Sequence, residues 1–165
     1  MSKTFWIFLG CGLVVIAILI SVMFMTTKSN HVDLTGEILK VRDYPLDESS
    51  TLVVTDFRVT NPSDIPFVVG GVTVTLDTLD KRTIQGTLIS KPELDKIFKY
   101  LKLLGPKYND ALSLQDRVAP HQTVDRTAGA KFELPESQVE GRRTVHIRVD
   151  EVDGNVAQIA EKGRQ

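Results

Sequence analysis

The fold is decided by two alternating stretches, LVVTDFRVT at residues 52–60 and FVVGGVTVTLDTL at residues 67–79. Alternation of apolar and polar side chains with a period of two is typical of a β-strand with one buried face. The faces predicted for the first stretch are an inward set, Val53, Thr55, Phe57 and Val59, and an outward set, Asp56, Arg58 and Thr60. The turn sequence NPSD at residues 61–64 ends this strand, because proline cannot extend a central ladder.

Further strands are predicted on both sides of this pair, at residues 36–42, 82–89, 118–134 and 144–152. A β-bulge or bend is predicted at Gly70 and Gly71, within the second stretch. Strands and helices do not alternate regularly, which argues against a parallel doubly wound sheet. The sequence therefore predicts a mainly β chain in which residues 36–153 form an antiparallel β-sandwich of immunoglobulin-like type, with a frayed tail at residues 154–165.

The period changes from two to 3.6 within residues 90–117, which predicts one helical insertion in the sandwich. Ser90 and Glu93 have the spacing of a capping box at its start. Gly105 and Pro106 predict its end. The apolar face of this helix would consist of Leu94, Ile97, Phe98, Leu101 and Leu104. The connections are predicted to be a second short helix at 109–116 and a loop at 135–141.

Residues 5–25 read FWIFLGCGLVVIAILISVMFM, an apolar run of 21 residues without a charged side chain. As a helix the run spans roughly 31 Å, about the thickness of the hydrocarbon core of a bilayer. We therefore expect a single-pass transmembrane helix between a short tail (1–4) and a juxtamembrane linker (26–35). The residues of this membrane anchor include Phe5, Trp6, Leu13, Ile16, Leu19 and Met25.

A cleaved secretory signal, a lipid-modified cysteine and a buried helix of a soluble protein are the alternatives to this uncleaved signal anchor. A buried helix is disfavoured because a segment that is apolar on every face has no water-facing side. A secretory signal is usually shorter and ends in a small-x-small cleavage site, whereas this run ends in Met23-Phe24-Met25. Cys11 lies near the start of the run, but a lipoprotein signal needs its cysteine just after the apolar stretch. The favoured orientation is a short cytoplasmic tail with an extracytoplasmic C-terminal domain.

Charge and cysteine content limit the classes of function. Residues 26–165 contain 19 basic and 21 acidic side chains, a formal charge of −2, so a nucleic-acid partner is not expected. The single cysteine lies in the apolar run, so no intrachain disulfide is expected to stabilise the domain. The expected partners are instead the lipid bilayer, through residues 5–25, and other envelope proteins.

The segment DFRVTNPSDIPFVVGGVTVTLDTLDKRTIQG at residues 56–86 resembles the late-embryogenesis-abundant type 2 proteins, their water-stress and hypersensitive-response relatives, and the bacterial FxLyD-type domains. In these families an alternating strand ends in Asn-Pro or Asn-Ser, and a long strand ending in a charged turn follows. Residues 118–132 are similar to the later segment, in which a turn with proline leads into an outer strand. The resemblance implies a small antiparallel sandwich, often anchored in a membrane and without catalysis, that is associated with stress protection or envelope interactions.

The chain contains histidines, carboxylates and serines, but they lack the spacing typical of metal sites or of catalytic nucleophiles. The three histidines are His31, His121 and His146, and none has zinc-ligand spacing to a partner. Asp150, Glu151 and Asp153 have the oxygen ligands that calcium prefers, but a solvated turn at Gly154 explains them equally well. Ser113 and Ser137 lack a nucleophile-elbow or Ser-x-x-Lys context. We therefore expect no enzyme, no cofactor, no metal and no catalytic residue.

Lysines decorate the outer side of the predicted helical insertion. Lys96, Lys99 and Lys102 are the candidates for contact with a partner or with anionic headgroups. The favoured interpretation, however, is a solvated lysine face, partly neutralised by an Asp95–Lys99 pair at spacing i, i+4.

Three hypotheses of function follow. The first is a membrane-tethered, non-enzymatic binding or structural domain that interacts with other components of the cell envelope. The second is a protein that protects against desiccation or osmotic stress, as the resembled family implies. The third is a hydrolase or a ligand-binding enzyme subunit with its site between the helical insertion and the sheet.

Overall fold

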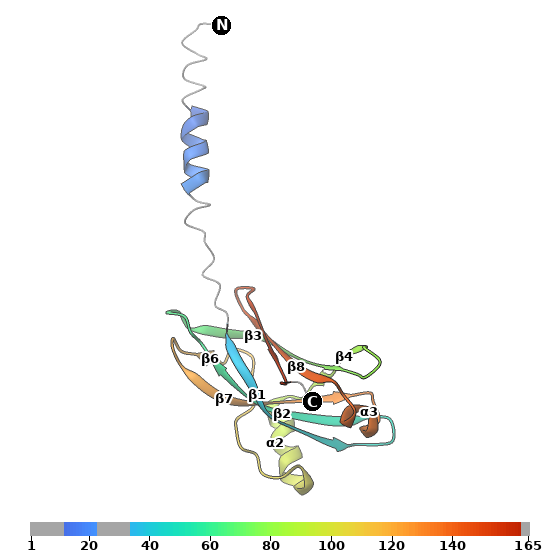
Figure 1. Cartoon of the computed structure of the whole chain (residues 1–165). Coiled ribbons are helices and arrows are strands. Elements are labelled where there is room, and N and C mark those ends of the chain that lie inside the picture. Colours follow the sequence, from blue (N-terminus) through green and yellow to red (C-terminus); the bar gives the residue numbers. More distant parts are fainter. Residues whose placement is uncertain (1–11, 23–33, 163–165) are drawn as a thin grey trace, which may run out of the picture. The chain divides into compact units, whose positions relative to one another are not determined.

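The computed structural model describes residues 12–22 and 34–162, and the chain divides into two units, Met1–His31 and Val32–Gln165 (Figure 1). In the first unit residues 12–22 form a helix with exposed side chains. Neither this helix nor those within 34–162 combine the length and the hydropathy that a bilayer crossing requires. Among the predicted anchor residues, Leu13, Ile16 and Leu19 lie on this helix. The others, Phe5, Trp6 and Met25, lie outside the described residues, as do the tail at 1–4 and linker residues 26–33.

The second unit contains two β-sheets, and every ladder in them is antiparallel (Figure 1). The first sheet consists, in order, of β1 (Thr35–Pro45), β2 (Thr51–Thr60), β7 (Thr123–Phe132) and β5 (Thr87–Leu88). The second consists of β4 (Thr83–Gln85), β3 (Phe67–Asp77), β8 (Thr144–Glu151) and β9 (Val156–Ala160), with β6 (Arg117–Val118) also paired to β3. The prediction of a mainly β, antiparallel sandwich is confirmed at this level.

The main hydrophobic core lies between the two sheets. Val53, Phe57 and Val59 of β2 contribute to it, as the alternation of residues 52–60 predicts. Val145, Ile147 and Val149 of β8 are its counterparts in the second sheet. The predicted bulge is also present, because the pairing of β3 with β8 shifts between Val69 and Gly71.

A second hydrophobic cluster lies on the other face of β2, so this strand is buried on both sides. Leu52 and Val54 pack there against Leu94 and Leu104. Leu94 and Leu104 belong to the helical insertion. Leu94 lies in α2 (Lys91–Tyr100), and Leu104 lies in the 3-10 helix η1 (Lys102–Leu104). The alternation of residues 52–60 predicts one buried face only, because alternation reports the strand and not what covers it.

The chain crosses between the sheets within residues 82–89, which were predicted to form a single strand. β4 pairs with β3 in the second sheet, whereas β5 pairs with β7 in the first. Gly86 lies between them, and a Cβ atom there would come within 2.8 Å of the ring of Phe132. The crossing therefore needs glycine at this position.

The structure corrects six local predictions. Residues 109–116 form no helix, and the loop predicted at 135–141 contains α3 (Glu136–Glu140). The tail predicted to fray contains β9, which pairs with β8. Ser90 lies at the N-cap of α2, but its side chain makes no capping hydrogen bond, and α2 ends at Tyr100, after which η1 continues to Leu104. Asp95 pairs with Lys107 and not with Lys99.

Candidate functional site

The helical insertion is attached to the first sheet by a buried ion pair. Arg42 on β1 and Asp56 on β2 lie 2.6 Å apart, with side chains 9% and 4% exposed. The same guanidinium donates hydrogen bonds to the carbonyl oxygens of Leu104, at 2.8 Å, and Pro106, at 2.9 Å. One arginine therefore joins two strands of the sheet to the end of the insertion.

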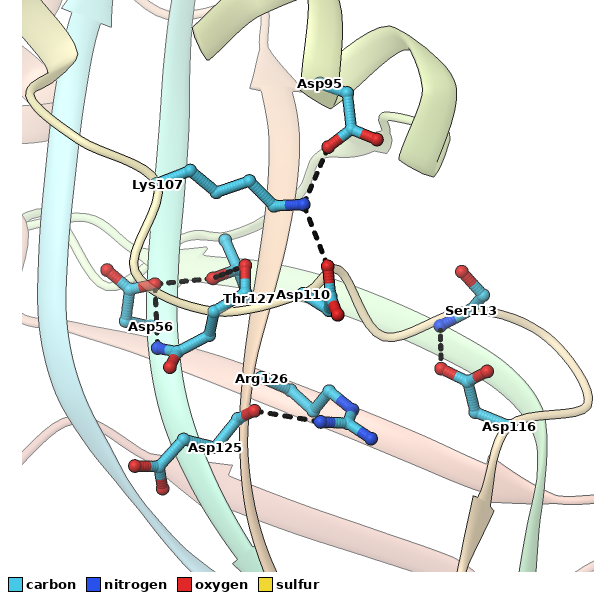
Figure 2. Close-up of polar contacts among 10 residues, drawn as sticks. Asp56, Asp95, Lys107, Asp110, Ser113, Asp116, Asp125, Arg126 and Thr127 are labelled. Carbon is cyan, nitrogen blue, oxygen red and sulfur yellow. Dashed lines mark hydrogen bonds and ion pairs between the residues drawn. The ribbon is translucent and has the colours of Figure 1, made fainter.

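Aromatic rings and polar side chains complete the surroundings of this pair. The rings of Phe98 and Tyr108 lie 5.0 Å and 5.4 Å from the Arg42 guanidinium, within the range of cation–π attraction. Thr127 on β7 donates its hydroxyl proton to Asp56 (Figure 2). Desolvation of two charges is expensive unless their hydrogen bonds are supplied, and these contacts supply them for Asp56 and for the Nη atoms of Arg42, whereas Arg42 Nε is buried without a hydrogen-bond partner among the described residues.

A second ionic contact holds the two ends of the insertion together. Lys107 Nζ lies 2.7 Å from Asp95 Oδ1 on α2 and 3.1 Å from Asp110 Oδ1 in the following loop, as Figure 2 shows. The hydrogen bond that Lys107 donates to Asp95 is the main cause that raises the pKa of Lys107. The hydrogen bond from Lys107 in turn lowers the pKa of Asp110. Both shifts favour the charged forms, so the contact persists through the neutral pH range.

Close packing positions α2 itself. The predicted apolar face of the helix is confirmed, because Leu94 and Leu104 are buried while Ile97, Phe98 and Leu101 pack against the same cluster. Leu94 rests on Gly129 of β7, where a Cβ atom would lie 2.7 Å from Leu94 Cδ1. Glycine at this position lets the helix approach the sheet closely.

The outer side of the insertion carries the three lysines predicted to contact a partner. Lys96, Lys99 and Lys102 are all exposed. The structure adds two exposed residues that the sequence prediction missed, Tyr100 at 73% and Leu103 at 86%. The spacing of Lys96 and Tyr100 at i and i+4 is the signal that could have identified Tyr100, whereas Leu103 lies in η1, beyond the end of α2.

The space between the insertion and the sheet, proposed as an enzyme cleft, is occupied by Leu94, Phe98 and Leu101 and by the Arg42–Asp56 pair. A pocket of about 390 Å³ lies beside the start of α2. Its lining is largely apolar, consisting of Val72, Leu88, Ile89, Ser90, Lys91, Pro92, Leu112, Ser113 and Leu114. Ser113, which lacks a nucleophile context in the sequence, is one of two serines in this lining, and its backbone N–H donates a hydrogen bond to Asp116 Oδ2 at 2.9 Å.

Both histidines of the described domain lie beside a carboxylate, whereas His31 lies outside the described residues. His121 Nε2 is 2.9 Å from Asp64 Oδ1 on an exposed turn. His146 Nε2 is 3.0 Å from Asp77 Oδ2, and this histidine is half-buried. Hydrogen bonds from Thr83 and then from His146 lower the pKa of Asp77.

The acidic residues considered for calcium do not converge. Asp150 is paired with Arg148 at 2.7 Å, and buried Glu151 accepts a hydrogen bond from Asn155 at 2.5 Å. A different trio does converge, since carboxylate oxygens of Asp43, Glu136 and Glu140 lie within 4.8 Å of one another. Oxygen ligands at this spacing suit a hard cation, but the Arg142 guanidinium, 3.8 Å from Asp43, already supplies positive charge there.

Comparison with known proteins gives structural similarities only, because no family model and no curated protein matches the chain. An uncharacterized β-sandwich protein from Clostridium difficile aligns at 11% identity over 79% of this chain and 86% of that chain, with a TM-score of 0.40. The archaellum periplasmic stator protein FlaG from Sulfolobus acidocaldarius aligns at 9% identity over 77% of this chain and 98% of that chain, with a TM-score of 0.35.

A Bacillus subtilis protein provisionally described as a lipoprotein aligns at 11% identity over 84% of this chain, with a TM-score of 0.48. The matched region is only 38% of the length of that protein. All three TM-scores lie below 0.5, so the sandwich described above rests on the chain's own strand pairing. The resemblance to late-embryogenesis-abundant type 2 proteins gains no support from a family model and stays a prediction.

Proposed function

We propose that this chain is a non-enzymatic binding or structural domain of the cell envelope, tethered to a lipid bilayer by residues 5–25. The observation that supports this most is the insertion on the first sheet. A buried ion pair holds it in place, while Tyr100 and Leu103 remain exposed beside lysines. Loops and insertions fixed on a rigid scaffold are where proteins commonly carry recognition.

The uses already made of the reactive side chains support a role without catalysis. Asp56 is neutralised by Arg42 and accepts a hydrogen bond from Thr127. The pocket beside α2 has a mostly apolar lining, without a histidine or a carboxylate among its lining residues. A catalytic site would need converging acid, base or nucleophilic groups, and this lining supplies few.

The tether follows from the charge-free run at residues 5–25. A domain held at a bilayer meets its neighbours at a raised effective concentration, so even weak contacts with envelope components become populated. In the proposed orientation the sandwich lies on the extracytoplasmic side.

Fractionation of lysed cells tests the membrane tether, and crosslinking in intact cells tests the binding role. The full chain is expected in the membrane fraction, released by detergent but not by high salt. A chain that lacks residues 1–33 is the matched control and is expected in the aqueous fraction. A reporter fused after Gln165 identifies the compartment of the domain.

Amine-reactive crosslinking is expected to join the domain to other envelope proteins. Full-length chain in the aqueous fraction without detergent, with its first thirty or so residues intact, contradicts the tether. Crosslinking that captures no neighbour from either side of the membrane contradicts the binding role.

A further inference from the structure

The outer side of the insertion forms one continuous stripe. Lys96, Lys99 and Tyr100 follow the spacing i, i+3 and i+4 on the exposed side of α2, and exposed Leu103 follows in η1, after the chain leaves the helical conformation at Leu101. Opposite them lies the apolar face that is packed on the sheet. Tyr100 and Leu103 are 73% and 86% exposed, and Lys99 Nζ lies 5.9 Å from the Tyr100 ring. This stripe, together with Lys102, is called the lysine stripe below.

Charge is distributed unevenly between the insertion and the rest of the chain. Residues 90–117 contain five lysines and Arg117 against four acids, Glu93, Asp95, Asp110 and Asp116, a formal charge of +2. The whole chain has a formal charge of −1, which leaves −3 for the remainder. Asp95 is engaged by Lys107, whereas the lysines of the stripe are exposed. The insertion therefore carries a local positive field on a negatively charged protein.

The stripe is also held rigidly. Leu94 packs on Gly129 behind it, and Arg42 binds the carbonyl oxygens of Leu104 and Pro106 at its end. Exposed apolar side chains on a mobile loop could fold away from water, but these are fixed in place. A preorganised surface loses little conformational entropy when it binds.

We infer that the lysine stripe docks on an anionic lipid bilayer, with the ammonium groups among the headgroups and with Tyr100 and Leu103 in the interfacial layer. Lysine suits a diffuse field of headgroups, since its charge sits on a flexible stem, whereas arginine suits bidentate pairing with individual carboxylates. Tyrosine and leucine beside lysine form the composition of interfacial membrane segments. This inference rests on the proposed envelope function and names the surface component that the domain contacts.

A fluorescent probe on the stripe tests the docking with the full chain. Cys11→Ser and Leu103→Cys create one attachment site for an environment-sensitive dye. The chain is reconstituted in vesicles of phosphatidylcholine, or of phosphatidylcholine mixed with phosphatidylglycerol. A blue shift of the dye emission is expected only with the anionic lipid. The shift is expected to disappear at high salt, because salt screens charges at a surface.

Charge reversal supplies the matched comparison. K96E/K99E/K102E is expected to abolish the shift, since each lysine near an anionic surface contributes about fivefold to binding, and so three contribute about 100-fold. K81E/K131E/K162E makes the same change in net charge away from the stripe and is expected to keep the shift. A dye at Leu79→Cys, a position 74% exposed on another turn, is expected to show none.

Three results overturn the inference: an equal shift in neutral vesicles, a shift that survives K96E/K99E/K102E, and no shift with either lipid. The salt dependence is measured with all stripe lysines present, so it tests the inference even if the triple variant folds poorly. If crosslinking finds protein neighbours while the dye does not respond, the envelope function stands and the lipid contact is wrong.

Discussion

At the scale of residues, Arg42 and Asp56 show how a buried charge can join separate segments. The pair links β1 to β2, and the same arginine reaches the backbone of the insertion at Leu104. The alternation of residues 52–60 places Asp56 on the outward face, and this position is confirmed. Asp56 is buried because α2 and η1 cover the outward face of β2. The partner of Asp56, Arg42, comes from the neighbouring strand β1. Local sequence carries no signal for such a partner.

Replacement of Asp56 by alanine is expected to lower the free energy of unfolding by about 3–5 kcal/mol, because it leaves the Arg42 charge buried without a counterion. Asp125→Ala is the control, since Asp125 pairs with Arg58 at 2.7 Å in an exposed position. Its loss is expected to stay below about 1 kcal/mol. Urea unfolding followed by circular dichroism in detergent measures both values. Equal losses for the two variants would contradict a special role of the buried pair.

At the scale of elements, the helical insertion is the part that periodicity predicted best. The spacing of apolar residues from Leu94 to Leu104 identified the face that packs on the sheet. Its boundaries were less accurate, because α2 ends at Tyr100 and a 3-10 turn continues to Leu104. Gly105, with φ of 77°, then ends that turn in a conformation that glycine adopts without strain. The glycine was a correct stop signal, although the helix type before it had changed.

Leu94→Ala is expected to destabilise the domain by about 2–5 kcal/mol, because it leaves a cavity above Gly129 at the centre of the helix–sheet contact. Leu103→Ala is the matched control in the same insertion, and since Leu103 is 86% exposed its effect is expected to stay within about 0.5 kcal/mol. Urea midpoints give the two values. Faster amide hydrogen exchange in residues 91–104 of the Leu94 variant would show that the insertion loosens; unchanged exchange would contradict its anchoring by Leu94.

At the scale of the whole domain, the sandwich is closed by segments that have weak strand signals. β9 contributes buried Ala157 and Ile159 to the core, although its surroundings are polar. Ile159 also lies over Gly36 of β1, where a Cβ atom would approach it within 2.8 Å, so β9 bridges the two sheets at their edge. Residues 154–165 were predicted to fray because most of their side chains are polar. That average composition hides the two side chains that face the core, Ala157 and Ile159.

Removal of residues 154–165 is expected to expose the core at this edge and to make the domain sensitive to protease at neutral pH. Removal of residues 163–165 alone is expected to leave the protease resistance of the full chain unchanged, because β9 stays intact. Limited proteolysis followed by mass spectrometry compares the three chains. Equal resistance of the longer truncation would show that the tail is dispensable, as its composition had suggested.

The sequence by itself determined the strand faces, the bulge at Gly70 and Gly71, the apolar side of the insertion and the unusual charge-free run at residues 5–25. Each of these is a pattern of neighbouring residues, and backbone geometry turns such a pattern directly into a face or a turn. Only the tertiary structure decided that the chain changes sheet at Gly86, that β2 is buried on both faces and that Arg42 pairs with Asp56. These features depend on contacts between distant segments, whose free energies no local pattern contains.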